Sequence, residues 1–240
     1  MSNIGAVMKK EVRSYLNSPI AYVAALFFLL VCAIWFFFVQ QFLARDLASM
    51  RSYFSIVPII FIVLIPALTM RIWAEERKLK TDEILLTLPM RDWQIVIGKY
   101  LSIFVLVTVV IILTIPIPIT LNALGDFETG EIVGEYIGTI LLGSAGIAIG
   151  QFISSVSKNQ ISAFIFSVLA LVFITLVGRL NVLLELPGWL TKVVNFLAMD
   201  YHFESFKKGL IDSRDVAYFI ILTAFFLFLN MKVLVFRKWK

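Results

Sequence analysis

Six long apolar stretches constrain this 240-residue chain more than any other feature. A helix that crosses a lipid bilayer needs about 20 predominantly apolar residues. The chain provides such lengths at residues 20–42, 54–72, 97–121, 136–154, 161–179 and 216–236. Because lipid offers no partners to backbone N–H and C=O groups, we expect helices even where Val and Ile favour strands. The charged fraction of 15%, against roughly 25% in a soluble domain, agrees. The predicted fold class is an all-α membrane protein with six transmembrane helices in one domain, residues 1–240.

The distribution of Lys and Arg predicts how the six helices are oriented. With the N-terminus in the cytosol, 14 of the 21 basic residues fall on the cytosolic side, as the positive-inside rule requires. The loop at residues 122–135 falls outside and carries acidic residues without a basic one. Both termini are therefore predicted to be cytosolic. The first stretch is long enough to span and has no clear cleavage site, so we expect a retained helix rather than a signal peptide.

Ionisable side chains are absent from the six stretches away from their ends. A charge at a helix centre costs roughly 2.5–3.5 kcal/mol, and carriers driven by protons or sodium ions keep such charges for function. The sequence therefore predicts an energy source in another chain. It contains no phosphate loop, hydrolase elbow or zinc-protease motif and no basic stripe for nucleic acid. Its single cysteine, Cys32, excludes a cysteine metal cluster. We expect neither an enzyme, a bound metal nor a nucleic-acid partner.

Residues 1–18, before the first span, are amphipathic. Apolar side chains fall near one helical face: Ile4, Val7, Met8, Val12, Tyr15 and Leu16. The basic residues Lys9, Lys10 and Arg13 fall opposite. This pattern predicts an interfacial helix on the cytosolic leaflet. A positive flank that only sets topology is the alternative.

Residues 73–96 form a charged loop that contains a helical pattern. Thr81 is a suitable N-cap, and Glu83 lies where the helix dipole favours an anion. An apolar ridge and a terminating proline follow: Ile84, Leu85, Leu88 and Pro89. An exposed ridge of this kind predicts a partner that covers it. The alternative is that the ridge folds back onto the spans.

Residues 180–215, before the last span, are too long for a plain connector. Residues 184–198 are fairly apolar but too short to span, so we expect external re-entrant half-helices there. His202 has no second His or Cys nearby, which favours a helix-cap or interface role over a metal site. In the fourth stretch, Gly134/Gly138 and Gly146/Gly150 are spaced for close helix packing, within the chain rather than between chains.

The charged loop resembles a known family. Its spacing is similar to the signature loop of ABC-2-type transporter permeases. The matching positions are Glu75, Glu76, Thr81, Glu83, Leu85 and Pro89, followed by Gly98, Lys99 and Tyr100. Lys80 stands where that family usually has glycine. The segment from Lys9 to Pro19, with residues 122–125 and 154–160, also resembles the gliding-motility-type branch of the family.

The resemblance implies a permease that dimerises, with an identical or a different subunit, and binds a separate cytosolic ABC ATPase. ATP and Mg²⁺ would bind that ATPase, and this chain would hold no cofactor. The coupling helix would use Glu75, Glu76, Thr81, Glu83, Ile84, Leu85, Leu88 and Pro89, helped by Lys9, Lys10, Arg13 and Tyr15 of the interfacial helix. The external segment with Leu186, Pro187 and Trp189 would close the outward end. An extracytoplasmic accessory protein often accompanies this branch. The implied location is the inner membrane of a bacterial cell.

Three functions stay open at this point. The first is ATP-driven export, and the second is a non-transporting subunit that transmits ATPase movement to an extracytoplasmic partner. The third is a passive channel or an ion-coupled carrier. The phenylalanines of the first span suit a path for a lipid, a lipid-linked molecule or an amphipathic peptide, or they simply face lipid: Phe27, Phe28, Phe36, Phe37 and Phe38.

Overall fold

The computed structural model describes residues 3–42, 49–79, 90–122, 128–179 and 187–238. Helices make up its regular structure, and no strand occurs in these ranges. The helices are α1 (Asn3–Leu16), α2 (Pro19–Ile34), α3 (Arg51–Phe54), α4 (Val57–Thr69), α5 (Arg71–Lys78), α7 (Asp92–Ile112), α8 (Pro116–Asn122), α9 (Thr129–Val156), α10 (Gln160–Leu176), α12 (Gly188–Leu197), α13 (Met199–Lys207) and α14 (Ser213–Lys238). A π-turn (Trp35–Val39) extends α2, and a 3₁₀ turn (Val177–Arg179) extends α10.

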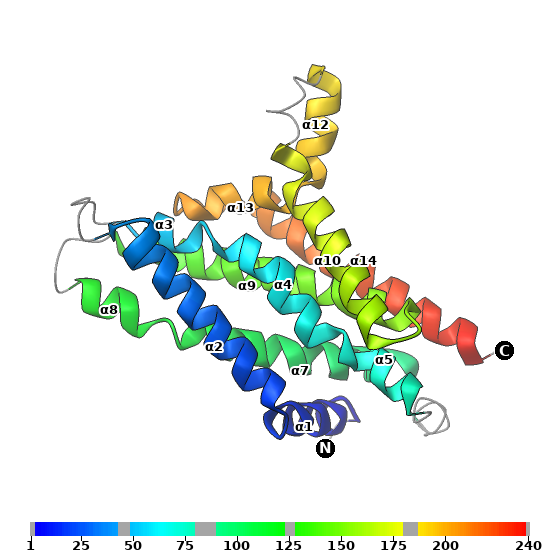
Figure 1. Ribbon diagram of the computed structural model, residues 1–240. Coiled ribbons are helices and arrows are strands. Elements are labelled where there is room, and N and C mark those ends of the chain that lie inside the picture. Colours follow the sequence, from blue (N-terminus) through cyan, green and yellow to red (C-terminus); the bar gives the residue numbers. More distant parts are fainter. Residues whose placement is uncertain (1–2, 43–48, 80–89, 123–127, 180–186, 239–240) are drawn as a thin grey trace.

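Six segments of the described chain are long and apolar enough to cross a membrane, which confirms the predicted fold class. They are Pro19–Val39, Arg51–Lys78, Asp92–Leu121, Thr129–Val156, Gln160–Arg179 and Ser213–Phe236. Figure 1 shows α1, α5 and the end of α14 at one end of the bundle, and α3, α8 and α13 toward the other. We call these the α1 end and the α3 end.

Several helices extend beyond the predicted spans, whereas the first apolar segment ends at Val39 rather than at residue 42. Residues 73–78 and 92–96, expected in a loop, continue as α5 and α7. Glu131 and Glu135, also expected in a loop, lie within α9 and are buried. Three of the charges in these extensions, Glu76, Glu131 and Glu135, are buried or paired with side chains of other elements, which a hydropathy window cannot detect.

Helix α9 is the centre of the bundle and contacts α4, α7, α10, α13 and α14. Its glycines permit this, since small residues let helix backbones approach closely. A Cβ atom on Gly146 or Gly150 would lie 2.7 Å from Ile65 Cδ1 or 2.3 Å from Thr69 Oγ1, both on α4. A Cβ on Gly138 would lie 2.4 Å from Phe206 Cβ on α13. The predicted role of these glycines in packing within the chain is therefore confirmed.

The long second span bends at Met70, between α4 and α5. Pro66, one turn earlier, cannot donate a backbone hydrogen bond. Ser154 of α9 compensates at the junction, because its hydroxyl oxygen accepts from the N–H groups of Trp73 and Ala74 at 3.2 and 3.4 Å. The same hydroxyl donates to the Met70 carbonyl at 3.1 Å. The orientation of α5 is thus determined by α9.

Helix α1 packs against the beginning of α7 at the α1 end (Figure 1). The two helices approach at Gly98, where a Cβ atom would meet Val7 Cβ at 2.8 Å. Val7 and Tyr15 of the predicted apolar face are buried against protein, whereas Leu16 is 46% exposed. The predicted apolar face is therefore divided, because part of it packs against the helix bundle and part of it is exposed.

The first span divides its aromatic side chains between two environments. Phe28 and Phe36 are buried, as is Cys32, whereas Phe27 and Phe38 are exposed. The phenylalanines therefore do not form one continuous lining within this chain.

Candidate functional site

A buried lysine joins three helices at the α1 end. Lys99 of α7 lies 3.1 Å from Glu11 Oε1 of α1 and 2.7 Å from Glu76 Oε1 of α5. It also donates to the carbonyl of Ile72 at 3.1 Å and lies over the Trp73 ring, 4.8 Å from the centroid. We call Glu11, Glu76 and Lys99 the Lys99 cluster.

The Lys99 cluster pairs one buried cation with two largely buried carboxylates. The Lys99 side chain is 1% exposed, and those of Glu11 and Glu76 are 13% and 15% exposed. A buried charge is tolerated when it is paired and its hydrogen-bonding capacity is used. Exposed Lys10 lies 3.8 Å from both carboxylates and adds a second, outer cation. The cluster therefore holds α1, α5 and α7 in one fixed arrangement.

A second pair lies beside the first. Arg71 donates from Nε to Glu75 at 2.7 Å and from Nη1 to Ser18 Oγ, also at 2.7 Å. Ser18 is the N-cap of α2, so this arginine links α5 to the turn that follows α1. Tyr15 packs under the guanidinium and donates to the Leu68 carbonyl at 2.7 Å. Burial raises the pKa of Tyr15, so its hydroxyl keeps the donated proton.

Arg77 fastens the end of α5 to the end of α9. Its guanidinium donates to the carbonyls of Ser155 and Ser157. Backbone carbonyls at a helix C-terminus lack intrahelical partners and carry partial negative charge, so an arginine there is favourable. Together with Ser154, this contact connects α5 to the central helix at both of its ends.

A polar cavity of about 250 Å³ lies between α1 and α5 and is lined by these same charged groups. Its walls include Lys10, Glu11, Arg71, Glu75 and Glu76. Leu79, which also lines it, is 64% exposed and is the last described residue before 80–89. The cavity therefore lies beside the end of α5.

The residues predicted for this site are only partly brought together. Glu75, Glu76, Lys10 and Tyr15 lie around the cavity, whereas Lys9 and Arg13 are exposed. The remaining predicted positions lie outside the described residues: Thr81, Glu83, Ile84, Leu85, Leu88 and Pro89.

Sequence reasoning missed Glu11 and treated Lys99 and Arg71 as topology signals or loop charges. A signal for Glu11 was present, because it falls four residues from both Val7 and Tyr15, on the apolar face of α1. A carboxylate on an apolar face indicates a cationic partner in the surface that it meets. Lys99 had a signal of another kind, since Gly98, Lys99 and Tyr100 follow the loop positions that resemble the permease family.

The α3 end holds a buried carboxylate near the start of α9, just before the predicted span of residues 136–154. Glu135 of α9 is fully buried, and neither of its carboxylate oxygens has a hydrogen-bond partner among the described residues. One turn earlier, Glu131 pairs with Arg51 and accepts from Ser49 at 3.3 Å. The two glutamates therefore lie on one face of α9, one with an ion-pair partner and one without a hydrogen-bond partner among the described residues.

Replacing Glu135 with Leu should raise the free energy of unfolding by about 1–3 kcal/mol, because a buried polar group without partners is removed. The matched change Glu131→Leu should lower it, because Arg51 loses its partner. Thermal unfolding of the purified variants in detergent measures both. A lower melting temperature for Glu135→Leu would show that the carboxylate has a stabilising partner.

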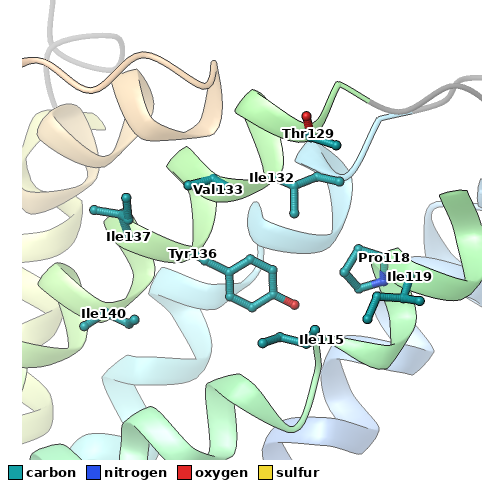
Figure 2. Close-up of a pocket in the computed structure, with 9 residues that line it drawn as sticks. All are labelled: Ile115, Pro118, Ile119, Thr129, Ile132, Val133, Tyr136, Ile137 and Ile140. Atoms are coloured by element: carbon teal, nitrogen blue, oxygen red, sulfur yellow. The ribbon is translucent and has the colours of Figure 1, made fainter.

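An apolar groove of about 450 Å³ lies between α8 and α9, toward the α3 end. Figure 2 shows Tyr136 of α9 between Ile132 and Ile140 on its own helix and Ile115 and Pro118 opposite. The Tyr136 hydroxyl is hydrogen-bonded to Thr114 at 2.8 Å. The groove therefore offers aliphatic surface rather than free polar groups to whatever contacts it.

The segment expected to form external half-helices contains two short helices, α12 and α13. Pro187 is the N-cap of α12, and Trp189 is 68% exposed on its first turn. Leu186 lies outside the described residues. None of the α12 side chains is buried.

Comparison with known families gives one finding. The family model described as "ABC-2 family transporter protein" matches residues 7–232. A search of curated proteins finds no match.

Proposed function

The chain belongs to the ABC-2 family of transporter proteins, and we propose that it is a permease subunit that couples to a separate cytosolic ATPase to export a substrate. Membrane subunits of this family are not themselves catalytic. The six apolar helices make this chain a multi-pass membrane protein. ATP and Mg²⁺ belong to the ATPase in this proposal, and this chain holds no cofactor.

The observation that carries the proposal is the Lys99 cluster and its place in the chain. Glu76 is three residues from the last described residue before 80–89, the segment whose spacing resembles a coupling helix. A partner that moves this segment therefore acts first on α5. The cluster transfers that movement to α1 and α7, and Arg77 transfers it to α9. Ion pairs and buried hydrogen bonds suit this role because they hold helices in fixed relative positions.

The finer parts of the proposal follow the resemblance. The subunit dimerises with an identical or a different subunit. The ATPase is contacted by the ridge of Ile84, Leu85 and Leu88, together with Thr81, Glu83 and Pro89. Lys9, Lys10, Arg13 and Tyr15 support this contact from α1. The segment with Leu186, Pro187 and Trp189 closes the outward end. Both termini lie in the cytosol of a bacterial cell, and the N-terminal segment favours the gliding-motility-type branch, with its extracytoplasmic partner.

Leu85→Asp tests the partner contact. A charge on the ridge should weaken binding of the cognate ABC ATPase by at least about tenfold, that is 1.4 kcal/mol or more. Leu85→Met is the matched control and should bind normally, since size and polarity are kept. Binding of the two purified subunits and ATP turnover in vesicles are the measurements. Unchanged binding by Leu85→Asp would show that the ridge is not the contact.

The same vesicles separate export from the second function. A subunit that only transmits movement to an extracytoplasmic partner would support ATP turnover without moving any candidate substrate across the bilayer. Flux without any ATPase would instead indicate a channel or an ion-coupled carrier.

A further inference from the structure

His202 connects helices α12, α13 and α14 where the last span begins. His202 of α13 is buried, and its Nδ1 lies 2.7 Å from Asp215 Oδ1 at the start of α14. Its Nε2 lies 3.1 Å from the carbonyl oxygen of Phe196, near the end of α12. The ring stacks on Tyr218 with 3.9 Å between centroids and 18° between planes. His202 thus lies in a helix interface, as its sequence context favoured.

The proton count of this arrangement follows from its geometry. A carboxylate and a backbone carbonyl are both acceptors, and a neutral imidazole has a single N–H to donate. Two hydrogen bonds from this ring therefore need two protons on the His202–Asp215 pair. Sharing of the second proton along the Nδ1–Oδ1 contact leaves that count unchanged. We infer that His202 is a positioning residue that fastens α12 to α14 while the pair holds two protons.

The charges around the ring leave Asp215 as its acidic partner within the described residues. Tyr218 of α14 and Tyr201 of α13 contact the ring, and neither is charged at neutral pH. The other charged groups of α13 are engaged elsewhere: Asp200 with Arg179 and Lys207, and Glu204 with Lys207. Lys192 of α12 and Arg214 of α14 are exposed, and on α9 Glu131 pairs with Arg51 while Glu135 has no hydrogen-bond partner among the described residues.

A pair that holds one proton fewer can make only one of the two hydrogen bonds. The remaining N–H can satisfy Asp215 or Phe196, and the other contact then joins two acceptors. Helix α12 has no buried side chain of its own to replace this link. The hydrogen bond from the Tyr218 hydroxyl to the Leu197 carbonyl, at 2.8 Å, remains. The result is a helix that is held less firmly, not one that is released.

The consequence for transport rests on the proposed function. If α12 helps to close the outward end, then how rigidly α12 is held there depends on the protonation of the His202–Asp215 pair. The positioning role itself is tested without the ATPase, so its failure and that of the proposed function are distinguishable.

Spin labels on α12 and α14 test whether the His202–Asp215 pair fastens the two helices. The chain has a single cysteine, so Cys32→Ala gives a cysteine-free background. Lys192→Cys and Arg214→Cys then place labels on exposed positions of α12 and α14. Double electron–electron resonance measures the distance distribution from about pH 5 to about pH 8, the range in which histidines change charge. With native His202 and Asp215, we expect a narrow distribution at the acidic limit that broadens toward the alkaline limit.

Asp215→Asn is the decisive variant, because the introduced amide can donate to Nδ1 of a neutral ring whose Nε2–H still donates to Phe196. Its distribution should stay narrow at every pH, whereas that of His202→Ala should be broad at every pH. A native pair that does not respond to pH, or an Asp215→Asn variant that responds as the native pair does, would overturn the inference. This comparison remains decisive even if His202→Ala fails to fold.

Discussion

Replacing Lys99 with Met is expected to destabilise the protein and to uncouple ATP hydrolysis from the membrane helices. Removing one partner of a buried ion pair costs about 3–5 kcal/mol, because the remaining charge is left without compensation. Here two carboxylates, Glu11 and Glu76, lose their common cation. Lys10 remains 3.8 Å from both, so the lower end of that range is expected. Chemical unfolding and ATP turnover of the reconstituted complex measure the two effects.

Lys10→Met is the matched control for Lys99→Met. It removes the same charge from the same carboxylates, but its side chain is 65% exposed. An exposed ion pair contributes about 0–1 kcal/mol, so this change should leave the free energy of unfolding nearly unchanged. A double-mutant cycle of Lys99→Met with Glu76→Gln should show coupling of about 0.5–3 kcal/mol, as expected for residues in contact. Equal effects of Lys99→Met and Lys10→Met would mean that burial of Lys99 has no energetic consequence.

Replacing Gly150 with Leu is expected to separate α9 from α4. Its Cβ would lie 2.3 Å from Thr69 Oγ1 and 3.0 Å from Thr69 Cβ, so one helix must move. Overpacking of this kind costs about 1–3 kcal/mol and occasionally more. Ser154, one turn along α9, would then lose its hydrogen bonds at the junction of α4 and α5. Both the melting temperature and the ATP turnover of the complex should fall.

Two comparisons test this explanation for Gly150→Leu. Gly130 also lies in α9, but no atom lies within 4 Å of a Cβ placed there, so Gly130→Ala should leave stability unchanged or slightly higher. Gly150→Ala should be partly rescued by Thr69→Ala, which removes the nearest atom. Absence of rescue would assign the cost to the α9 backbone rather than to the contact with α4.

The charged residues at the α1 end and the α3 end illustrate what a single sequence can reveal. Glu75 and Glu76 were predicted at a functional loop, and they line a polar cavity at the α1 end. Glu11 was recognisable in principle from its place on an apolar helix face. Lys99 lay among the positions that resemble the family, but its burial could not be predicted, because a lysine near the end of a span is also an ordinary topology signal. Glu135 was assigned to a loop for a similar reason, since a carboxylate directly before an apolar stretch normally marks the end of a transmembrane helix.

The sequence by itself determined that the chain spans a membrane as six helices and that α1 is amphipathic. Both are local properties, since apolar length and helical periodicity are read within some twenty residues. Only the tertiary structure decided where the spans end, which glycines pack on which helix and which charges are buried. Glu11 and Lys99 show the physical reason, because they are 88 residues apart in the chain and 3.1 Å apart in space. A buried charge is stable only beside its partner, and that partner is supplied by the fold.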